Sequence, residues 1–267
     1  MKKVLSVAGS DCSGGAGIQA DLKTFSAHGV FGMTVITSVV AENTCRVIEF
    51  QDVRPDIIAK QIDAVFEDIP PDAVKVGMLS CRETMLTVAE KLREWGAQNV
   101  VIDPVMYAKN GCELMDSSAI DTLIAEVIPL ADVLTPNIPE AEKITGMTIQ
   151  TRDDMIKAAH EIHKGGCKAV IIKGGHSDGD ATDILFDGKE VYSYSSPRID
   201  TKNTHGTGCT FSSSVAANLA NGNTFDKSVG LAKDYITGAI EHSLPIGKGH
   251  GPTNHFHKFY KDGEFQI

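Results

Sequence analysis

The sequence lacks long apolar runs and has fewer basic than acidic residues. Its first apolar run ends at Ala8, too early for a signal peptide, and no later run approaches the roughly 20 residues of a membrane-spanning helix. Lys and Arg number 25 against 35 Asp and Glu, which gives a formal net charge of −10. Because this charge repels nucleic acid and anionic membranes, we expect neither as a partner. Any anionic ligand must be bound by local features of the fold.

The six cysteines are scattered, and none forms a Cys-x-x-Cys pair. Zinc sites and disulfide frameworks use patterned cysteines, so we expect reduced thiols and a cytoplasmic protein. A chain of 267 residues with 42% hydrophobic content can bury a substantial core, which excludes a disordered protein. We find no repeat, low-complexity tract or long linker, and we therefore expect a single domain over residues 1–267.

Short runs rich in Val and Ile alternate with amphipathic segments, which indicates βαβ units around a parallel sheet. The expected strands are residues 4–8, 34–40, 73–79, 99–103, 133–135 and 169–173. The expected helices are residues 17–28, 55–68, 83–95, 117–127, 152–164, 207–220 and 227–242. Two further runs, 182–186 and 190–194, flank Asp187-Gly188. An Asp-Gly turn between apolar runs predicts a hairpin, so we expect antiparallel strands late in the sheet.

Glycine-rich or polar loops follow several of these strands. In a parallel sheet the carboxyl ends of the strands share one edge, where ligands bind. We therefore expect these loops to converge on one crevice. Their sequences are GSDCSGGAG, GML, DPVM, TPNIPE and KGGH.

The most informative loop, residues 204–210, reads THGTGCT and begins a predicted helix. Gly206 and Gly208 allow close approach of the backbone, and the free amides of a first helical turn attract anions. This predicts an anion-binding loop, although glycines that only relieve turn strain are an alternative. Cys209 lies in the same turn, where a helix N-terminus lowers thiol pKa values and could create a base. A cysteine that is merely a small buried hydrophobic residue is the alternative.

The first loop, residues 9–17, lacks the Lys and Ser/Thr of a P-loop. Its GAGIQA segment matches G-x-G-x-x-A but starts too far beyond the strand for a tight dinucleotide-binding turn, which leaves that reading as a minor alternative. Asp11 and Asp21 could instead contact a polar small molecule. For Asp21, a solvated acid in a first helical turn is the alternative.

Three further positions could serve a phosphorylated ligand. Asn137 and Glu140 begin a helix just past a strand and could hold hydrated Mg²⁺ through oxygen ligands, or be ordinary first-turn residues. Lys173 directly follows an apolar strand and supplies a positive charge, for a phosphate or for an internal salt bridge. Residues 109–111 could form a mobile flap or an ordinary loop.

These motifs together resemble the hydroxymethylpyrimidine and phosphomethylpyrimidine kinases of thiamine biosynthesis, over nearly the whole chain. The matching segments, in order, are AGSDCSGGAGIQADLKTF, AENT, GML, DPVM, TPNIPEA, KGGH and NTHGTGCTF. The resemblance implies an α/β, ribokinase-like fold, with a central mostly parallel sheet flanked by helices on both faces, and a homodimer that uses ATP and Mg²⁺. It also implies that 4-amino-5-hydroxymethyl-2-methylpyrimidine is phosphorylated on its hydroxyl, and that the monophosphate is then converted to the diphosphate.

The resemblance also implies roles for individual residues. The pyrimidine would contact Gly9, Asp21, Glu42, Met78 and Val105. The catalytic set would be Cys209 as base with Gly206, Gly208 and Lys173. ATP would contact Lys173, Thr207 and Gly208, and Mg²⁺ would be held by Asn137 and Glu140. Many ribokinase relatives have an aspartate base where this chain has Cys209.

One position departs from the family pattern, which often has Gln where this chain has Glu42. An amide can donate to a ring nitrogen and accept from an amino group, whereas an ionised carboxylate only accepts. We therefore expect Glu42 or the bound pyrimidine to carry a proton.

A pyridoxal or pyridoxine kinase, which can share the T-H-G-x-G-C segment, is the alternative function. A non-catalytic nucleotide-binding sensor would have to lack a working base and metal site.

Overall fold

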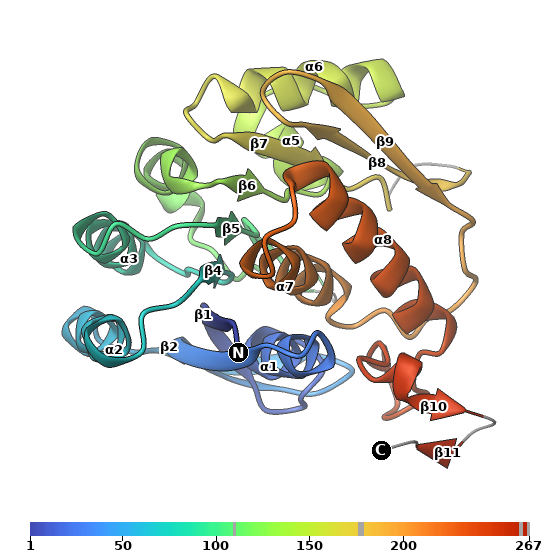
Figure 1. Cartoon of the computed structure of the whole chain (residues 1–267), viewed down its shortest axis with the longest axis horizontal. Coiled ribbons are helices and arrows are strands. Elements are labelled where there is room, and N and C mark those ends of the chain that lie inside the picture. The colour runs from blue at the N-terminus through green and yellow to red at the C-terminus, as the bar shows by residue number, and fades with distance from the viewer. Residues whose placement is uncertain (109–110, 176–178, 262–263, 266–267) are drawn as a thin grey trace.

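A nine-stranded sheet forms the centre of the computed structural model, which describes residues 1–108, 111–175, 179–261 and 264–265 (Figure 1). The strand order is β3-β2-β1-β4-β5-β6-β7-β8-β9. Neighbours from β2 to β7 are parallel, whereas β3, β8 and β9 pair antiparallel at the two edges. The strands are β1 (Lys3–Asp11), β2 (Phe31–Glu42), β3 (Val47–Asp52), β4 (Ala73–Val76), β5 (Val100–Ile102), β6 (Val133–Leu134), β7 (Ala169–Ile172), β8 (Ala181–Phe186) and β9 (Val191–Ser196).

Helices cover both faces of the sheet (Figure 1). One layer contains α1 (Gly17–Ala27), α7 (Thr207–Ala220) and α8 (Phe225–Glu241), and α7 lies against β4 and β5. The other contains α2 (Pro55–Asp68), α3 (Arg82–Glu94), α5 (Ile138–Thr145) and α6 (Arg152–His163). Alternate residues of β1 serve the two layers, since Leu5 and Val7 join one apolar core and Val4 the other. The two-sided core explains why the strands read as continuous apolar runs.

The predicted fold class is confirmed, including the late antiparallel strands β8 and β9. Helices α2 and α7 begin and end at the predicted residues. The antiparallel strand β3 at the opposite edge was not predicted. Its residues are half-buried or exposed and none is buried, so this edge strand gives no continuous apolar run.

The predicted helix over 117–127 is wrong in detail. The segment is an irregular series of short turns: Ser117–Ala119, α4 (Ile120–Thr122), the π-helical Leu123–Val127 and Ile128–Leu130. Pro129 in the last turn has no amide hydrogen to continue an α-helical ladder. The short strands β10 (Tyr260–Lys261) and β11 (Glu264–Phe265) near the C-terminus were also not predicted.

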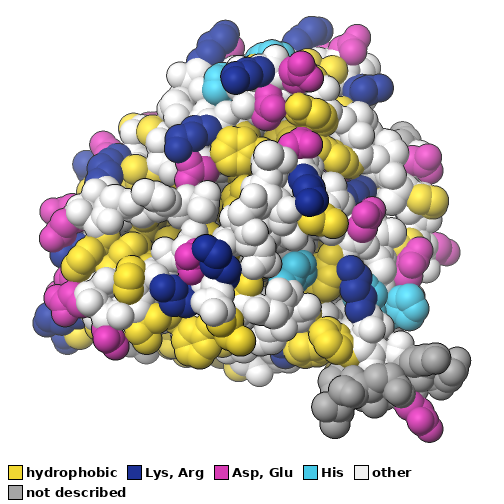
Figure 2. Space-filling model, in the orientation of Figure 1, with side chains coloured by type: hydrophobic (Ala, Val, Ile, Leu, Met, Phe, Trp, Pro, Cys, Tyr) yellow, Lys and Arg dark blue, Asp and Glu magenta, His cyan; other side chains and the backbone are white. Residues whose placement is uncertain are grey.

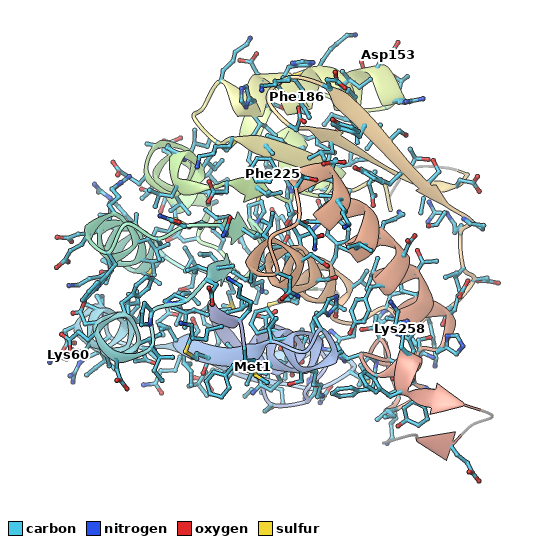
Figure 3. The ribbon with its side chains drawn as sticks, in the orientation of Figure 1. Met1, Lys60, Asp153, Phe186, Phe225 and Lys258 are labelled. Atoms are coloured by element: carbon cyan, nitrogen blue, oxygen red, sulfur yellow. The ribbon has the colours of Figure 1, made fainter. Side chains whose placement is uncertain are left out.

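Figure 2 shows acidic and basic side chains interspersed over one face of the molecule. Figure 3 places Phe186 at the end of β8, where its ring centroid is 3.9 Å from that of His160 on α6. Within the described ranges, no helix has the length and apolarity needed to cross a membrane.

Candidate active site

The predicted anion-binding loop lies at the N-terminus of α7, with Gly206 as the N-cap residue. Gly206 has φ 77° and ψ 9°, the left-handed conformation that glycine adopts without strain. A Cβ atom at Gly206 would overlap the carbonyl oxygen of Gly15 in the first loop. Among the described residues no side chain caps this end of the helix. The amide of Thr207 donates to the carbonyl of Thr204 at 3.4 Å, which leaves the first-turn amides of Gly208 and Cys209 for a ligand.

We expect Gly206→Ala to damage this loop more than left-handed strain alone would. A left-handed alanine costs about 1–2 kcal/mol of stability through backbone strain alone. The overlap of its Cβ with the carbonyl oxygen of Gly15 would also displace the first loop. Gly222 is the matched control because it also has positive φ but has open space where a Cβ would lie. Thermal unfolding and ATP titration should show a weaker nucleotide site for Gly206→Ala and a stability loss alone for Gly222→Ala. Equal effects on ATP affinity would contradict this assignment.

Lys173 directly follows β7 and lies beside the same loop. Its Nζ is 2.8 Å from Oδ1 of Asp103, and the lysine side chain is 16% exposed. A Cβ at Gly208 would lie 3.2 Å from Oδ2 of Asp103 and 3.5 Å from Nζ of Lys173. Although burial opposes it, Asp103 raises the pKa of Lys173. A half-buried cation therefore lies next to these amides, held by a carboxylate that the sequence analysis did not assign.

Cys209 is half-buried in the first turn of α7. Burial raises the pKa of its thiol to about 11, with Asp21 and Asp103 adding to the shift and Lys75 opposing it. The expectation of a lowered thiol pKa is therefore wrong for the unliganded protein. The helix N-terminus does not outweigh the loss of water around the sulfur.

Asn137 and Glu140 form a capping box at the start of α5. Oδ1 of Asn137 accepts from the amide of Glu140 at 2.9 Å, and Oε2 of Glu140 accepts from the amide of Asn137 at 2.8 Å. The geometry is that of first-turn residues, and a metal role for them stays a prediction. Burial raises the pKa of Glu140 to about 7, with Lys173 opposing and Asp103 adding to the shift.

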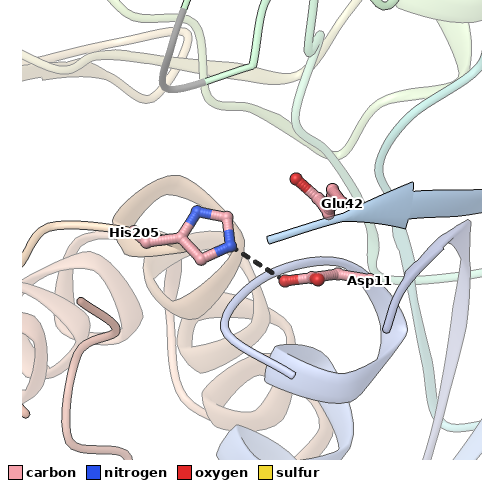
Figure 4. Close-up of side chains that lie close together, drawn as sticks. All are labelled: Asp11, Glu42 and His205. Atoms are coloured by element: carbon pink, nitrogen blue, oxygen red, sulfur yellow. Dashed lines mark hydrogen bonds and ion pairs between the residues drawn. The ribbon is translucent and has the colours of Figure 1, made fainter. Parts of the chain in front are cut away.

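Asp11, Glu42 and His205 lie together where the first loop meets the loop before α7 (Figure 4), with one potential ligand atom from each within 4.8 Å of the others. Oδ2 of Asp11 accepts from the amides of Gly15 and Ala16 at 2.9 and 2.7 Å and faces Nε2 of His205 at 2.9 Å. Against the effect of burial, such hydrogen bonds hold the pKa of Asp11 well below its usual range. Oδ2 of Asp11 thus forms a clasp between the first loop and the loop before α7.

Glu42 is the last residue of β2 and is half-buried beside this clasp. Burial and the neighbouring Asp11 carboxylate raise the pKa of Glu42 to about 7. At neutral pH a substantial fraction of Glu42 is therefore protonated and can donate a hydrogen bond.

The other residues predicted to contact the pyrimidine fall into two groups. A Cβ at Gly9 would lie 3.0 Å from the sulfur of Met78, and Met78 belongs to a small apolar cluster with Val105 against it. Asp21, in contrast, is fully buried, and its Oδ2 is 2.9 Å from Nζ of Lys75. The solvated-acid alternative for Asp21 is wrong, because its carboxylate binds partners inside the protein.

The expected flap is described only in part, since residues 109 and 110 lie outside the described residues, as does His176 of the KGGH segment. The flanking residues form a hairpin, with Tyr107 bridged to Glu113 and the amide of Leu114 donating to the carbonyl of Met106 at 2.9 Å. Leu114 packs in the apolar cluster with Met78. One strand of the hairpin therefore contacts the apolar cluster that contains Met78.

Comparisons with known proteins agree with this geometry. The family model for phosphomethylpyrimidine kinase matches residues 11–254. The chain is 51% identical to a thiamine biosynthesis bifunctional protein of Geobacter sulfurreducens over 94% of its length, but it spans only 52% of that protein. It is 48% identical to the hydroxymethylpyrimidine/phosphomethylpyrimidine kinase of Bacillus subtilis, covering 95% of this chain and 94% of that one. A solved ADP complex of Bacillus subtilis pyridoxal kinase superposes with a TM-score of 0.89 at 42% identity, covering 96% and 97% of the two chains.

Proposed function

The chain belongs to the phosphomethylpyrimidine kinase family, and from this we propose that it phosphorylates 4-amino-5-hydroxymethyl-2-methylpyrimidine with ATP and then converts the monophosphate to the diphosphate. One observation carries the proposal: the Gly206 loop and Lys173 lie beside Cys209. Met78 and Glu42 follow or end other strands of the same sheet, at their carboxyl ends. Because the formal net charge of −10 does not attract phosphate, the local cation and amides must supply the binding.

The nucleotide end of the crevice neutralises and aligns the triphosphate. The first-turn amides of α7 donate to phosphate oxygens, and Lys173 supplies a positive charge beside them. Phosphoryl transfer depends mainly on such alignment and charge neutralisation. Cys209 takes the proton of the acceptor hydroxyl as its oxygen attacks the γ-phosphorus and ADP leaves.

The residues around Lys173 also fit a magnesium ion. Asp103 and Glu140 place two buried carboxyl groups near the single charge of Lys173, and Mg²⁺ prefers such oxygen donors. Asn137 and Glu140 already bond backbone amides, so they would hold the ion through its water molecules. When bound with ATP, Mg²⁺ neutralises phosphate charge.

Glu42 makes pyrimidine binding dependent on pH. Its neutral carboxyl accepts from the 4-amino group and donates to the ring nitrogen, whereas the carboxylate lacks a donor. With a pKa of about 7, affinity should fall as pH rises from 6 to 9. Calorimetric titration should show this fall in the wild type and its loss in Glu42→Gln. Glu49→Gln on the exposed part of β3 is the control, and a flat wild-type profile would contradict the shared proton.

Pyridoxal is the second candidate acceptor, favoured by the similarity to a pyridoxal kinase structure. Release of ADP should be measured with Mg-ATP and, separately, the hydroxymethylpyrimidine, its monophosphate and pyridoxal. Turnover of both pyrimidines supports the proposal. Turnover of pyridoxal alone would keep the nucleotide end but replace the acceptor, and no turnover with any of the three would favour a nucleotide-binding sensor.

We assign the outer edge of the sheet at β3 to a homodimer. We also propose a cytoplasmic setting, because the six scattered cysteines of the sequence show no pattern of a disulfide framework. Val39, Ile48 and Ile57 are exposed on β2, β3 and α2, and Val39 and Ile57 line a shared surface groove. Burying these residues against a second copy would remove apolar surface from water. Sedimentation velocity should give a dimer for the wild type and a smaller species for Ile48→Asp. A monomeric wild type would contradict this assignment.

A further inference from the structure

Two buried lysine–aspartate pairs interact with Cys209, and nucleotide binding explains only one of them. Lys173 and Asp103 border the amide of Gly208, and the Lys173 side chain is 16% exposed. Lys75 and Asp21 are joined at 2.9 Å, and both side chains are 0% exposed. A phosphate cannot reach this sealed pair. The pair can therefore affect the reaction only through the residues that it contacts.

The sealed pair is connected to the two helices that meet at the Cys209 sulfur. The amide of Gly17, the first residue of α1, donates to that sulfur, and Asp21 lies one turn further along α1. Ser213 lies one turn beyond Cys209 on α7 and donates to Oδ1 of Asp21 at 2.6 Å. Residues four apart lie on one face of a helix. The α1 face that carries Gly17 therefore also carries Asp21, and the α7 face that carries Cys209 also carries Ser213, which binds Asp21.

The charges facing the thiol come from four elements. Lys75 on β4 favours its ionisation, and Asp21 on α1 and Asp103 after β5 oppose it. Lys173 after β7 also interacts with the thiol. Of the two cations, Lys75 is the one sealed from solvent, with a side chain that is 0% exposed. Asp21 raises the pKa of Lys75 against the effect of burial, so the lysine keeps its positive charge.

Stability alone does not explain such a pair. Burying two charges costs desolvation, and well-packed apolar residues of the same volume are often at least as stable. The sequence AVKV places Lys75 in the middle of a strand that is otherwise apolar. A nearby cation in a region of low dielectric does, however, strongly favour an anion.

We propose that Lys75 is a positioning residue for phosphoryl transfer, whose ammonium group, held by Asp21, stabilises the Cys209 thiolate. The inference rests on the proposed role of Cys209 as base. The proton moves from the acceptor hydroxyl to the cysteine sulfur, the hydroxyl oxygen bonds to the γ-phosphorus, and the bond to ADP breaks. Lys75 keeps its own proton throughout.

The test is alkylation of Cys209 by iodoacetamide between pH 6 and 10, followed by mass spectrometry of the peptide that contains Cys209. Lys75→Met should slow this alkylation at least tenfold at each pH below 9 and lower kcat by a similar factor, with little change in the KM for ATP. Alkylation needs neither ATP nor an acceptor. A wrong acceptor assignment would therefore leave this result unchanged.

Two further variants separate the charge effect from damage to the fold. Lys75→Met with Asp21→Asn removes both charges, so it leaves no unpaired carboxylate if the single variant fails to fold. This double variant should alkylate more slowly than the wild type but faster than the single variant. Lys233→Met breaks another buried pair, with Asp183 at 2.9 Å, and should leave Cys209 alkylation unchanged. Wild-type alkylation in the double variant, or equal slowing by Lys233→Met, would overturn the proposal.

Discussion

Replacing Cys209 by alanine should lower turnover by about 10²–10⁴-fold, the usual contribution of a general base. The KM for ATP should change little, because the free amides of α7 and Lys173 remain. Steady-state kinetics with saturating pyrimidine would measure both quantities. Cys81→Ala, which changes a half-buried cysteine at the start of α3, is the control. Unchanged turnover in Cys209→Ala would remove the base assignment.

The raised thiol pKa adds a pH signature to this prediction. With a pKa of about 11 in the unliganded protein, the thiolate fraction rises about tenfold for each pH unit between 7 and 9. Turnover of the wild type should rise over this range wherever proton transfer limits the rate. The residual turnover of Cys209→Ala should be flat over the same range. A flat wild-type profile with a rate-limiting chemical step would contradict the thiolate.

Lys173→Met should lower turnover by about 10²–10³-fold, the range found when one preorganised electrostatic contact is lost. Its loss also leaves Asp103 and Glu140 without their nearest cation, so the KM for Mg-ATP should rise. Lys173→Arg keeps the charge and should recover part of the turnover. Lys168→Met, which removes an exposed lysine paired with Asp132, is the surface control.

Stability must be measured in the same experiment. Removing one partner of a buried ion pair can cost about 3–5 kcal/mol, so turnover should be compared between folded fractions, as given by thermal unfolding. Full turnover in folded Lys173→Met would contradict its role at the triphosphate.

Local signals in the sequence predicted the bounds of two helices, and one of them, α7, positions the site. Pro55 marks the first turn of α2, and the glycines before α7 mark its start, so neither helix needed long-range information. The edge strand β3 was missed because none of its residues is buried. The irregular turns before β6 were missed because helical periodicity does not reveal where the hydrogen-bond pattern changes.

Charge pairing across the sheet was the part of the site that the sequence could not reveal. Lys173 and Asp103 are 70 positions apart, and Lys75 and Asp21 are 54 apart. A lysine within an apolar strand is a visible signal, but the sequence does not name its partner. The pKa of Cys209 was misjudged for a related reason. The amide of Gly17 at the start of α1 contacts the thiol. A sequence motif on α7 carries no information about this contact or about the burial of the sulfur.

The central claim is transfer of two phosphoryl groups in succession to one pyrimidine. Phosphorus NMR of the protein with Mg-ATP and 4-amino-5-hydroxymethyl-2-methylpyrimidine tests this claim most directly. We predict that a phosphomonoester signal appears first and then declines as diphosphate signals grow, with two ADP formed for each pyrimidine. Consumption of ATP with pyridoxal but with neither pyrimidine would contradict the account.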